Sequence, residues 1–159
     1  AQDELPCLLY LQGGPGFPAK RPSCPPSGWM KAALAKHRVL LLDQRGTGRS
    51  SAVTARQLLA LGSPAEQAEF LTHFRADSIV RDCEVVRGEL AGGKPITLLG
   101  QSFGGFCILT YLSLFPDAVE RALFTFGLAP VGRTAEEVYS ATYLRMEERN
   151  RRFYRRYPQ

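Results

Sequence analysis

The chain has 159 residues, of which 45% are hydrophobic and 22% are charged, the composition of an ordinary globular protein long enough for one buried core. Its first residues, AQDELPCLLYL, contain no basic leader and too short an apolar run to cross a bilayer. We therefore expect no signal peptide, no membrane contact and a cytoplasmic location. The four cysteines form no CxxC pair, so a zinc site is not expected.

The formal net charge of +5 comes largely from one segment. Residues 144–159 hold six arginines and two glutamates, a local excess of four positive charges. A basic face of this kind is usually solvated, and no nucleic-acid recognition motif accompanies it. Binding of nucleic acid is therefore not expected.

Four short apolar segments have the length of strands and lack the alternation of a half-exposed sheet. They are LPCLLYL (5–11), RVLLLD (38–43), PITLLG (95–100) and RALFTFG (121–127). Strands that are apolar at consecutive positions are typical of a parallel sheet covered on both faces. We expect all four to be buried on both faces.

Helical patterns separate these strands, at residues 29–36, 64–90 and 103–115. Strands that alternate with helices indicate βαβ units and the α/β class. In the long second segment, Ile79, Cys83, Val86 and Leu90 form one apolar stripe that predicts a helix packed on the sheet. We expect Cys7, Cys83 and Cys107 to be small core residues.

The pattern changes after residue 133. Thr134 and Glu137 form a predicted capping box that opens a polar helix running toward Tyr157. Because this helix does not continue the alternating plan, we expect residues 1–133 to belong to one unit and residues 134–159 to begin another.

The strongest chemical signal is GQSFG at residues 100–104, which lies between a predicted strand and a predicted helix. A GxSxG sequence in this context is typical of a nucleophile elbow, in which the serine occupies a strained turn. Glycines two residues to either side let strand and helix approach each other. We expect Ser102 to be a nucleophile in a sparsely populated backbone conformation.

Two further glycine-rich motifs follow strands. QGGPG at residues 12–16 stands where such a fold supplies a backbone donor to an oxyanion, and we expect the Gly14–Pro15 bond to be cis. DQRGTGRS at residues 43–50 lacks the lysine and the spacing of a phosphate-binding loop. We expect Asp43, Gln44 and Arg45 to brace the loops around the elbow.

In this order, QGGPG, DQRGTGRS and GQSFG resemble the motifs of the prolyl aminopeptidase family, also called proline iminopeptidases, of the α/β-hydrolase fold. The resemblance covers nearly the whole chain and implies a serine hydrolase that releases N-terminal proline from small peptides without a metal or organic cofactor. It also implies that Gly14, in preference to Gly13, and Phe103 donate backbone N–H groups to the oxyanion. The helix that starts after Thr134 would begin the family's helical cap.

Two features depart from the family. Gln12 stands where the family has histidine, and no histidine follows Ser102, although the triad of this fold runs serine, acid, histidine along the chain. We expect His37 and His73 to be surface residues. Asp117 and Glu120 follow the elbow helix directly, and we expect both to be solvated.

The catalytic acid and histidine are thus missing from these residues, and we expect the chain to be the N-terminal, inactive part of a longer enzyme. Two alternatives remain open. One is an esterase or another acyl hydrolase that uses the same elbow, and the other is a non-catalytic pseudoenzyme or assembly module. The oligomeric state is not predicted.

Overall fold

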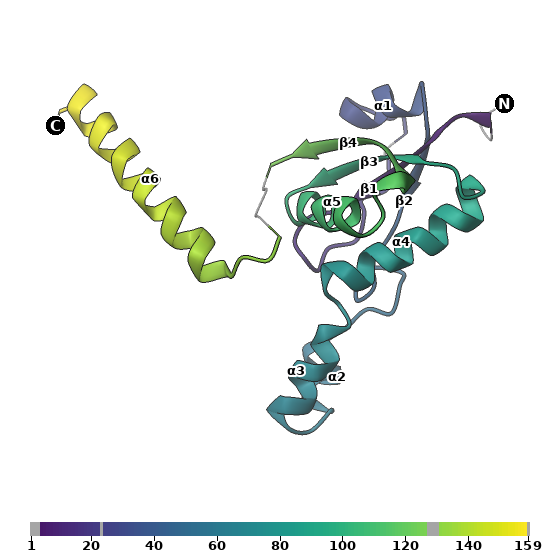
Figure 1. Cartoon of the computed structure of the whole chain (residues 1–159), viewed down its shortest axis with the longest axis horizontal. Helices are drawn as coiled ribbons and strands as arrows, with labels where there is room; N and C mark the ends of the chain where they lie inside the picture. The colour runs from purple at the N-terminus through teal and green to yellow at the C-terminus, as the bar shows by residue number, and fades with distance from the viewer. Residues whose placement is uncertain (1–3, 23, 127–130, 159) are drawn as a thin grey trace. The chain divides into compact units, whose positions relative to one another are not determined.

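The computed structural model describes residues 4–22, 24–126 and 131–158, and the chain forms two compact units, residues 1–128 and 129–159 (Figure 1). The division expected at residue 133 stays a prediction. The elements of the first unit are β1 (Cys7–Leu11), α1 (Gly28–Leu34), β2 (Arg38–Leu41), α2 (Ala55–Leu59), α3 (Pro64–Thr72), α4 (Ala76–Ala91), β3 (Ile96–Gln101), α5 (Phe103–Leu114), a 3₁₀ turn (Pro116–Ala118) and β4 (Val119–Thr125). The second unit contains α6 (Ala135–Arg156).

The four strands form one parallel sheet in the order β2-β1-β3-β4. The expected α/β class is confirmed, with helices between successive strands. Leu9 of β1 lies opposite Leu40 of β2 and Leu98 of β3, so the carboxyl ends of these strands meet at one edge. The loops after β1, β2 and β3 all leave from this edge.

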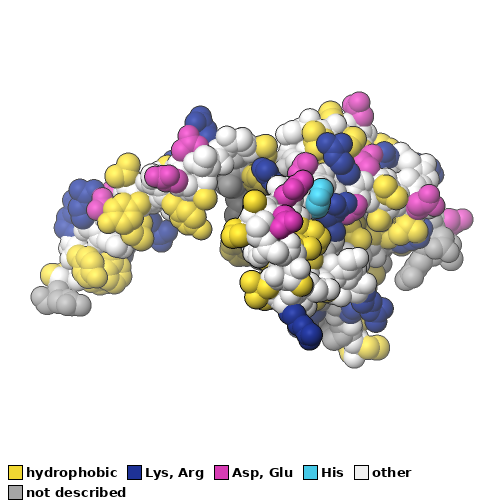
Figure 2. All heavy atoms as spheres, turned by 90° about the horizontal axis from the view of Figure 1, so that it is seen from below, with side chains coloured by type: hydrophobic (Ala, Val, Ile, Leu, Met, Phe, Trp, Pro, Cys, Tyr) yellow, Lys and Arg dark blue, Asp and Glu magenta, His cyan; other side chains and the backbone are white. Residues whose placement is uncertain are grey.

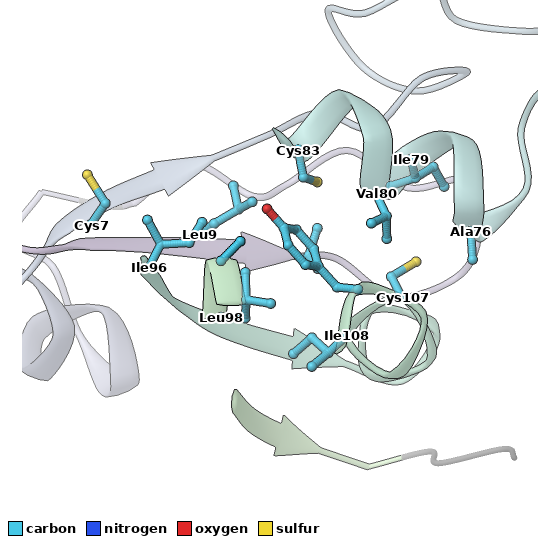
Figure 3. Packing of buried hydrophobic residues seen from close by; sticks show 13 residues of the cluster. Cys7, Leu9, Ala76, Ile79, Val80, Cys83, Ile96, Leu98, Cys107 and Ile108 are labelled. Carbon is cyan, nitrogen blue, oxygen red and sulfur yellow. The ribbon is translucent and has the colours of Figure 1, made fainter. Parts of the chain in front are cut away.

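Both faces of β1 are covered, which explains its uninterrupted apolar sequence. Leu9 and Leu11 face α4 and α5, whereas Leu8 and Tyr10 face the side on which α1 packs. Figure 3 shows the first face, where Leu9 and Leu98 lie near Cys83 and Cys107. The core therefore lies between the central strands and the two helices α4 and α5.

The outer strands are less buried than their sequences predict. β2 is only partly buried, and β4 is exposed at most of its positions, with Leu123 46% and Phe124 36% exposed. The expectation that all four strands are buried on both faces is therefore wrong for β2 and β4. A strand at the end of a sheet has a neighbour on one side only, and an apolar sequence does not reveal its place in the strand order. The last residue of the expected fourth strand, Gly127, lies outside the described residues.

The expected helix over residues 64–90 is two helices, α3 and α4, separated by residues 73–75. No glycine or proline marks this break. The Phe74 ring packs against Gly46, and the His73 carbonyl accepts a hydrogen bond of 2.9 Å from Arg45 Nη1. Contacts with the loop after β2 thus interrupt the helix. The short α2, with its capping box between Thr54 and Gln57, was not predicted.

The apolar stripe of α4 is buried near the start of the helix, as predicted, and is more exposed near its end. Ile79 and Cys83 are buried and Val86 is half-buried, whereas Leu90 is 43% exposed. The helix ends at Gly92 in a left-handed conformation (φ 59°), which glycine adopts without strain. The amphipathic helix therefore covers the sheet mainly through its first three turns.

A polar network joins α4 to α5. The Tyr111 hydroxyl, from a fully buried side chain of α5, donates a hydrogen bond to the Glu84 carboxylate. Arg87 grips the same carboxylate with two hydrogen bonds of 2.8 and 2.7 Å. The hydrogen bonds from Arg87 lower the pKa of Glu84, with a further contribution from Tyr111 and against the effect of burial. The Glu84 carboxylate is thus hydrogen-bonded by side chains of both α4 and α5.

Helix α6 begins at the capping box that the sequence predicts. The Thr134 hydroxyl accepts a hydrogen bond from the Glu137 backbone N–H at 3.2 Å, and the Glu137 carboxylate accepts one from the Thr134 N–H at 2.8 Å. Aromatic side chains lie beside arginines along this helix (Figure 2). None of the described helices is long and apolar enough to span a membrane.

The Glu84 network leads to a stability prediction. Glu84→Ala leaves the Arg87 guanidinium and the Tyr111 hydroxyl without their partner, and we expect a loss of about 2–3 kcal/mol in the free energy of unfolding. Because the pKa of Glu84 is lowered in the folded state, its contribution is complete above the unfolded pKa and is lost as pH falls through the folded one. Urea unfolding of both proteins, at pH 7 and at a pH well below the ordinary glutamate pKa of about 4.3, measures how far the stability difference shrinks in acid.

The matched control is Glu89→Ala, an exposed position on the same helix, for which we expect a change within about 0.5 kcal/mol. Equal losses for the two variants at pH 7, or a difference that does not shrink in acid, would contradict the role given to Glu84.

Candidate active site

Ser102 occupies the sharp turn between β3 and α5. Its backbone angles are φ 54° and ψ −115°, a conformation that residues with a side chain rarely adopt. The Ser102 N–H donates to the Thr125 carbonyl at 3.0 Å, and its own carbonyl accepts from Gly105 N–H at 2.8 Å at the start of α5. Strand, turn and helix over residues 95–116 are as the GxSxG spacing predicts.

The glycines around Ser102 are needed because main chains touch there. A Cβ on Gly104 would lie 1.9 Å from the Leu11 carbonyl oxygen, and one on Gly100 would lie 2.5 Å from the Gly104 carbonyl. Real Cβ atoms do not come so close to backbone atoms, so any side chain at these positions displaces α5. The first turn of α5 is thus pressed against the carboxyl end of β1.

The QGGPG loop passes directly beside the serine. A Cβ on Gly13 would lie 2.9 Å from Ser102 Cβ and 2.6 Å from the Gln101 carbonyl oxygen. Gly13 is buried, whereas Gly14, with φ 125°, is exposed. The Gly14–Pro15 peptide bond is cis, as expected from the sequence. The structure therefore brings the expected nucleophile and the glycine loop together.

Gln12 begins this loop and is held from two sides. The Tyr10 hydroxyl donates to Gln12 Oε1 at 2.8 Å, and Gln44 Nε2 donates to the Gln12 carbonyl at 3.1 Å. Burial raises the pKa of Tyr10, so its hydroxyl stays a donor at neutral pH. The residue that departs from the family motif is thus fixed in place.

The buried Asp43 carboxylate ties the loop after β1 to the loop after β2. It accepts hydrogen bonds from the backbone N–H groups of Ala19 and Arg49, both at 2.9 Å, and from Arg21 Nη1 at 3.1 Å. The bond from Arg49 lowers the pKa of Asp43 most, and those from Ala19 and Arg21 add to it, against burial. Gly48 (φ 52°) leaves room for the carboxylate, because a Cβ there would lie 2.3 Å from its Oδ2.

Arg45 connects the same loop to α4. It binds Asp82 through two hydrogen bonds of 2.7 and 2.6 Å, which raise its own pKa. The bracing roles expected for Asp43, Gln44 and Arg45 agree with these contacts.

Within the described part of the chain, neither histidine forms a hydrogen bond with Ser102. His37 directly precedes β2, at the amino end of the sheet, about 20 Å along the strands from the level of Ser102. It is half-buried, and its Nδ1 is buried without a hydrogen-bond partner among the described residues, so the expectation of a surface residue is wrong. His73 is exposed, as expected, and so are Asp117 and Glu120.

Three of the four cysteines are core residues, and Cys24 is exposed. Cys7, Cys83 and Cys107 are buried, as expected. Burial raises the pKa of Cys83, with the neighbouring Cys107 adding to it, and burial raises the pKa of Cys107 to about 12. Within the described ranges, no three side chains of the metal-binding types gather into a cluster.

The sequence and the fold of this chain match those of known proteins. The model of the alpha/beta hydrolase fold family matches residues 6–157. The chain belongs to the α/β-hydrolase fold family.

Relatives within this α/β-hydrolase family bear out the resemblance to prolyl aminopeptidases. A proline iminopeptidase of Aeromonas sobria is 61% identical over 156 residues, which cover 98% of this chain and 36% of that protein. A proline iminopeptidase of Aspergillus aculeatus is 41% identical over 162 residues, with the same two shares. The solved structure of a proline iminopeptidase-related protein from Thermus thermophilus superposes with a TM-score of 0.54 at 28% identity, over 77% of this chain and 36% of that one.

This α/β-hydrolase chain therefore spans just over a third of the length of these relatives. The residues of this chain that the family model matches, 6–157, include the GxSxG turn and the two glycine-rich loops. The sequence did not predict the two hydrogen bonds that hold Gln12. Its partners, Tyr10 and Gln44, belong to no motif that would indicate these contacts.

The contact between α5 and β1 gives a second prediction. Gly104→Ala places a methyl group on the Leu11 carbonyl, and we expect a loss on the order of 3 kcal/mol in the free energy of unfolding. The control is Gly88→Ala in α4, where a Cβ meets no atom within 4 Å, so the better helix former should stabilise by about 0.5–1 kcal/mol. Urea unfolding of both variants measures the contrast, and a Gly104→Ala protein as stable as the wild type would contradict the close approach.

Proposed function

We propose that this chain supplies the nucleophile and the oxyanion donors of a serine hydrolase that releases N-terminal proline from small peptides. The observation that carries the proposal is the strained turn at Ser102 with Gly13 packed against it. The names of the relatives support the choice of substrate. A metal or organic cofactor has no part in the proposed reaction.

Ser102 Oγ would attack the carbonyl carbon of the scissile bond, and its proton would pass to a histidine. The bond to the leaving amine would then break, the amine would take that proton, and water would release proline from the acyl-enzyme. The acid and the histidine of the triad are proposed to lie outside residues 1–159, since no histidine follows Ser102 here. The helix after Thr134 is proposed to begin a cap over the site.

Gly14 and Phe103 are the proposed oxyanion donors. Phe103 is the first residue of α5, where backbone N–H groups have no partner within the helix and the helix dipole favours negative charge. Gly14 is favoured over Gly13 because Gly14 is exposed, whereas Gly13 is buried against Gln101 and Ser102. Each such donor contributes about 3 kcal/mol to stabilisation of the transition state.

The direct test is release of proline by the protein extended with its downstream coding sequence. We expect prolyl dipeptides to be cleaved and Ser102→Ala to lower kcat by about 10⁶-fold. Ser113→Ala, an exposed serine on the same helix, should leave kcat within about twofold, since it is a surface change. Cleavage of acyl esters without cleavage of prolyl peptides would instead favour an esterase, and no Ser102-dependent hydrolysis at all would favour a non-catalytic module.

Residues 1–159 alone should not be a competent hydrolase. Without a base the Ser102 hydroxyl stays neutral, and the oxyanion donors and binding can retain only about 10³–10⁴-fold catalysis over water. A serine-directed fluorophosphonate should therefore label the extended protein rapidly and residues 1–159 slowly, as measured by mass spectrometry. Rapid stoichiometric labelling of Ser102 in the short chain would overturn this expectation.

A further inference from the structure

A cavity of about 560 Å³ lies between the end of β1 and the start of α1. Its volume is within the range of pockets that bind small ligands. The residues that line it and bear on its chemistry are Tyr10, Gln12, Lys20, Arg21, Trp29 and Met30.

One residue of the cavity wall is the chain neighbour of a residue that packs against the nucleophile. Gln12 forms part of that wall, and the next residue, Gly13, is packed against Ser102. Because consecutive Cα atoms are about 3.8 Å apart, the cavity wall at Gln12 is coupled to the loop that packs on Ser102. The hydrogen bond of 2.8 Å from Tyr10 to Gln12 Oε1 fixes that wall.

One side of the cavity is aromatic. The rings of Tyr10 and Trp29 lie with their centroids 4.8 Å apart, and Met30 beside them is buried. Trp29 is 42% exposed, so part of its ring is free for contact with a ligand. Such a surface favours an apolar side chain.

The other side of the cavity is cationic. Arg21 forms an ion pair with Asp43 through Nη1, which also donates to the Ala19 carbonyl, and its side chain is 44% exposed. Lys20 is exposed and has no ion-pair partner within the part of the chain that the structure describes. Two cations beside an aromatic wall, with no acidic residue in the lining, are suited to a carboxylate.

We propose that this cavity binds the leaving side of a short peptide substrate, with its apolar side chain on Trp29 and its free C-terminal carboxylate at Lys20 and Arg21. This inference rests on the proposed function for its link to catalysis. It assigns to the site a preference for peptides short enough to bring their carboxylate into the cavity, over amidated or long peptides.

The chain contains a single tryptophan, Trp29, which makes its fluorescence a probe of this cavity alone. The titrants are the dipeptide Leu-Gly and the same dipeptide as its C-terminal amide, added to residues 1–159. We expect saturable change with the free acid and at least about fivefold weaker binding of the amide, and an effect that weakens as salt is raised.

The matched variants are Lys20→Gln, which removes the free cation without touching the bonds of Asp43, and Lys36→Gln, an exposed lysine outside the lining. Lys20→Gln should weaken binding of the free acid about fivefold and leave the amide unchanged, whereas Lys36→Gln should change neither. Equal binding of acid and amide, or no fluorescence change with either, would overturn the proposal.

A second measurement in the extended enzyme keeps the two proposals apart. We expect a lower KM for Pro-Leu-Gly than for Pro-Leu-Gly amide, a preference that Lys20→Gln removes and Lys36→Gln keeps. Proline release with equal KM values for the free acid and the amide would contradict the proposed carboxylate site and leave the proposed function intact. A carboxylate-dependent fluorescence response without proline release would sink the proposed function and leave the binding site standing.

Discussion

The contact between the first turn of α5 and the end of β1 governs the geometry of this protein. At Gly104 the helix backbone lies against the Leu11 carbonyl so closely that a single methyl group would collide with it. Since α5 starts at this point, the chain must turn sharply at Ser102, in a conformation with positive φ. One steric constraint therefore sets both the packing of the helix and the position of the half-buried candidate nucleophile at the edge of the sheet.

The second requirement of such a site is a set of loops that hold their shape. A buried carboxylate does this here, because Asp43 accepts bonds from the loop after β1 at Ala19 and from its own loop at Arg49. Three donors keep the charge favourable in spite of burial, and they lower the pKa of the group. Asp43, in the loop after β2, thus holds the segment that follows the glycine loop beside Ser102. Arg21, which lines the cavity, binds the same carboxylate.

Much of the fold could be predicted because its signals are local. Uninterrupted apolar segments predicted the strands β1 and β3. The start of α6 was predicted from the capping box, in which the side chains of Thr134 and Glu137 accept hydrogen bonds from backbone N–H groups. The break between α3 and α4 could not be predicted, since it depends on Phe74 packing on Gly46 from a distant loop. The exposure of β4 could not be predicted either, because it depends on where that strand stands in the sheet order.

The sequence by itself determined the candidate nucleophile and the loops around it, because GxSxG and QGGPG are short motifs whose residues are contiguous in the chain. Only the tertiary structure decided that Gly13 is buried while Gly14 stays exposed, and that Gln12, Lys20 and Trp29 line one cavity. These relations join residues that are separate along the chain. They depend on how the segment between β1 and α1 folds over the end of β1 and beside β3, and no short motif records them.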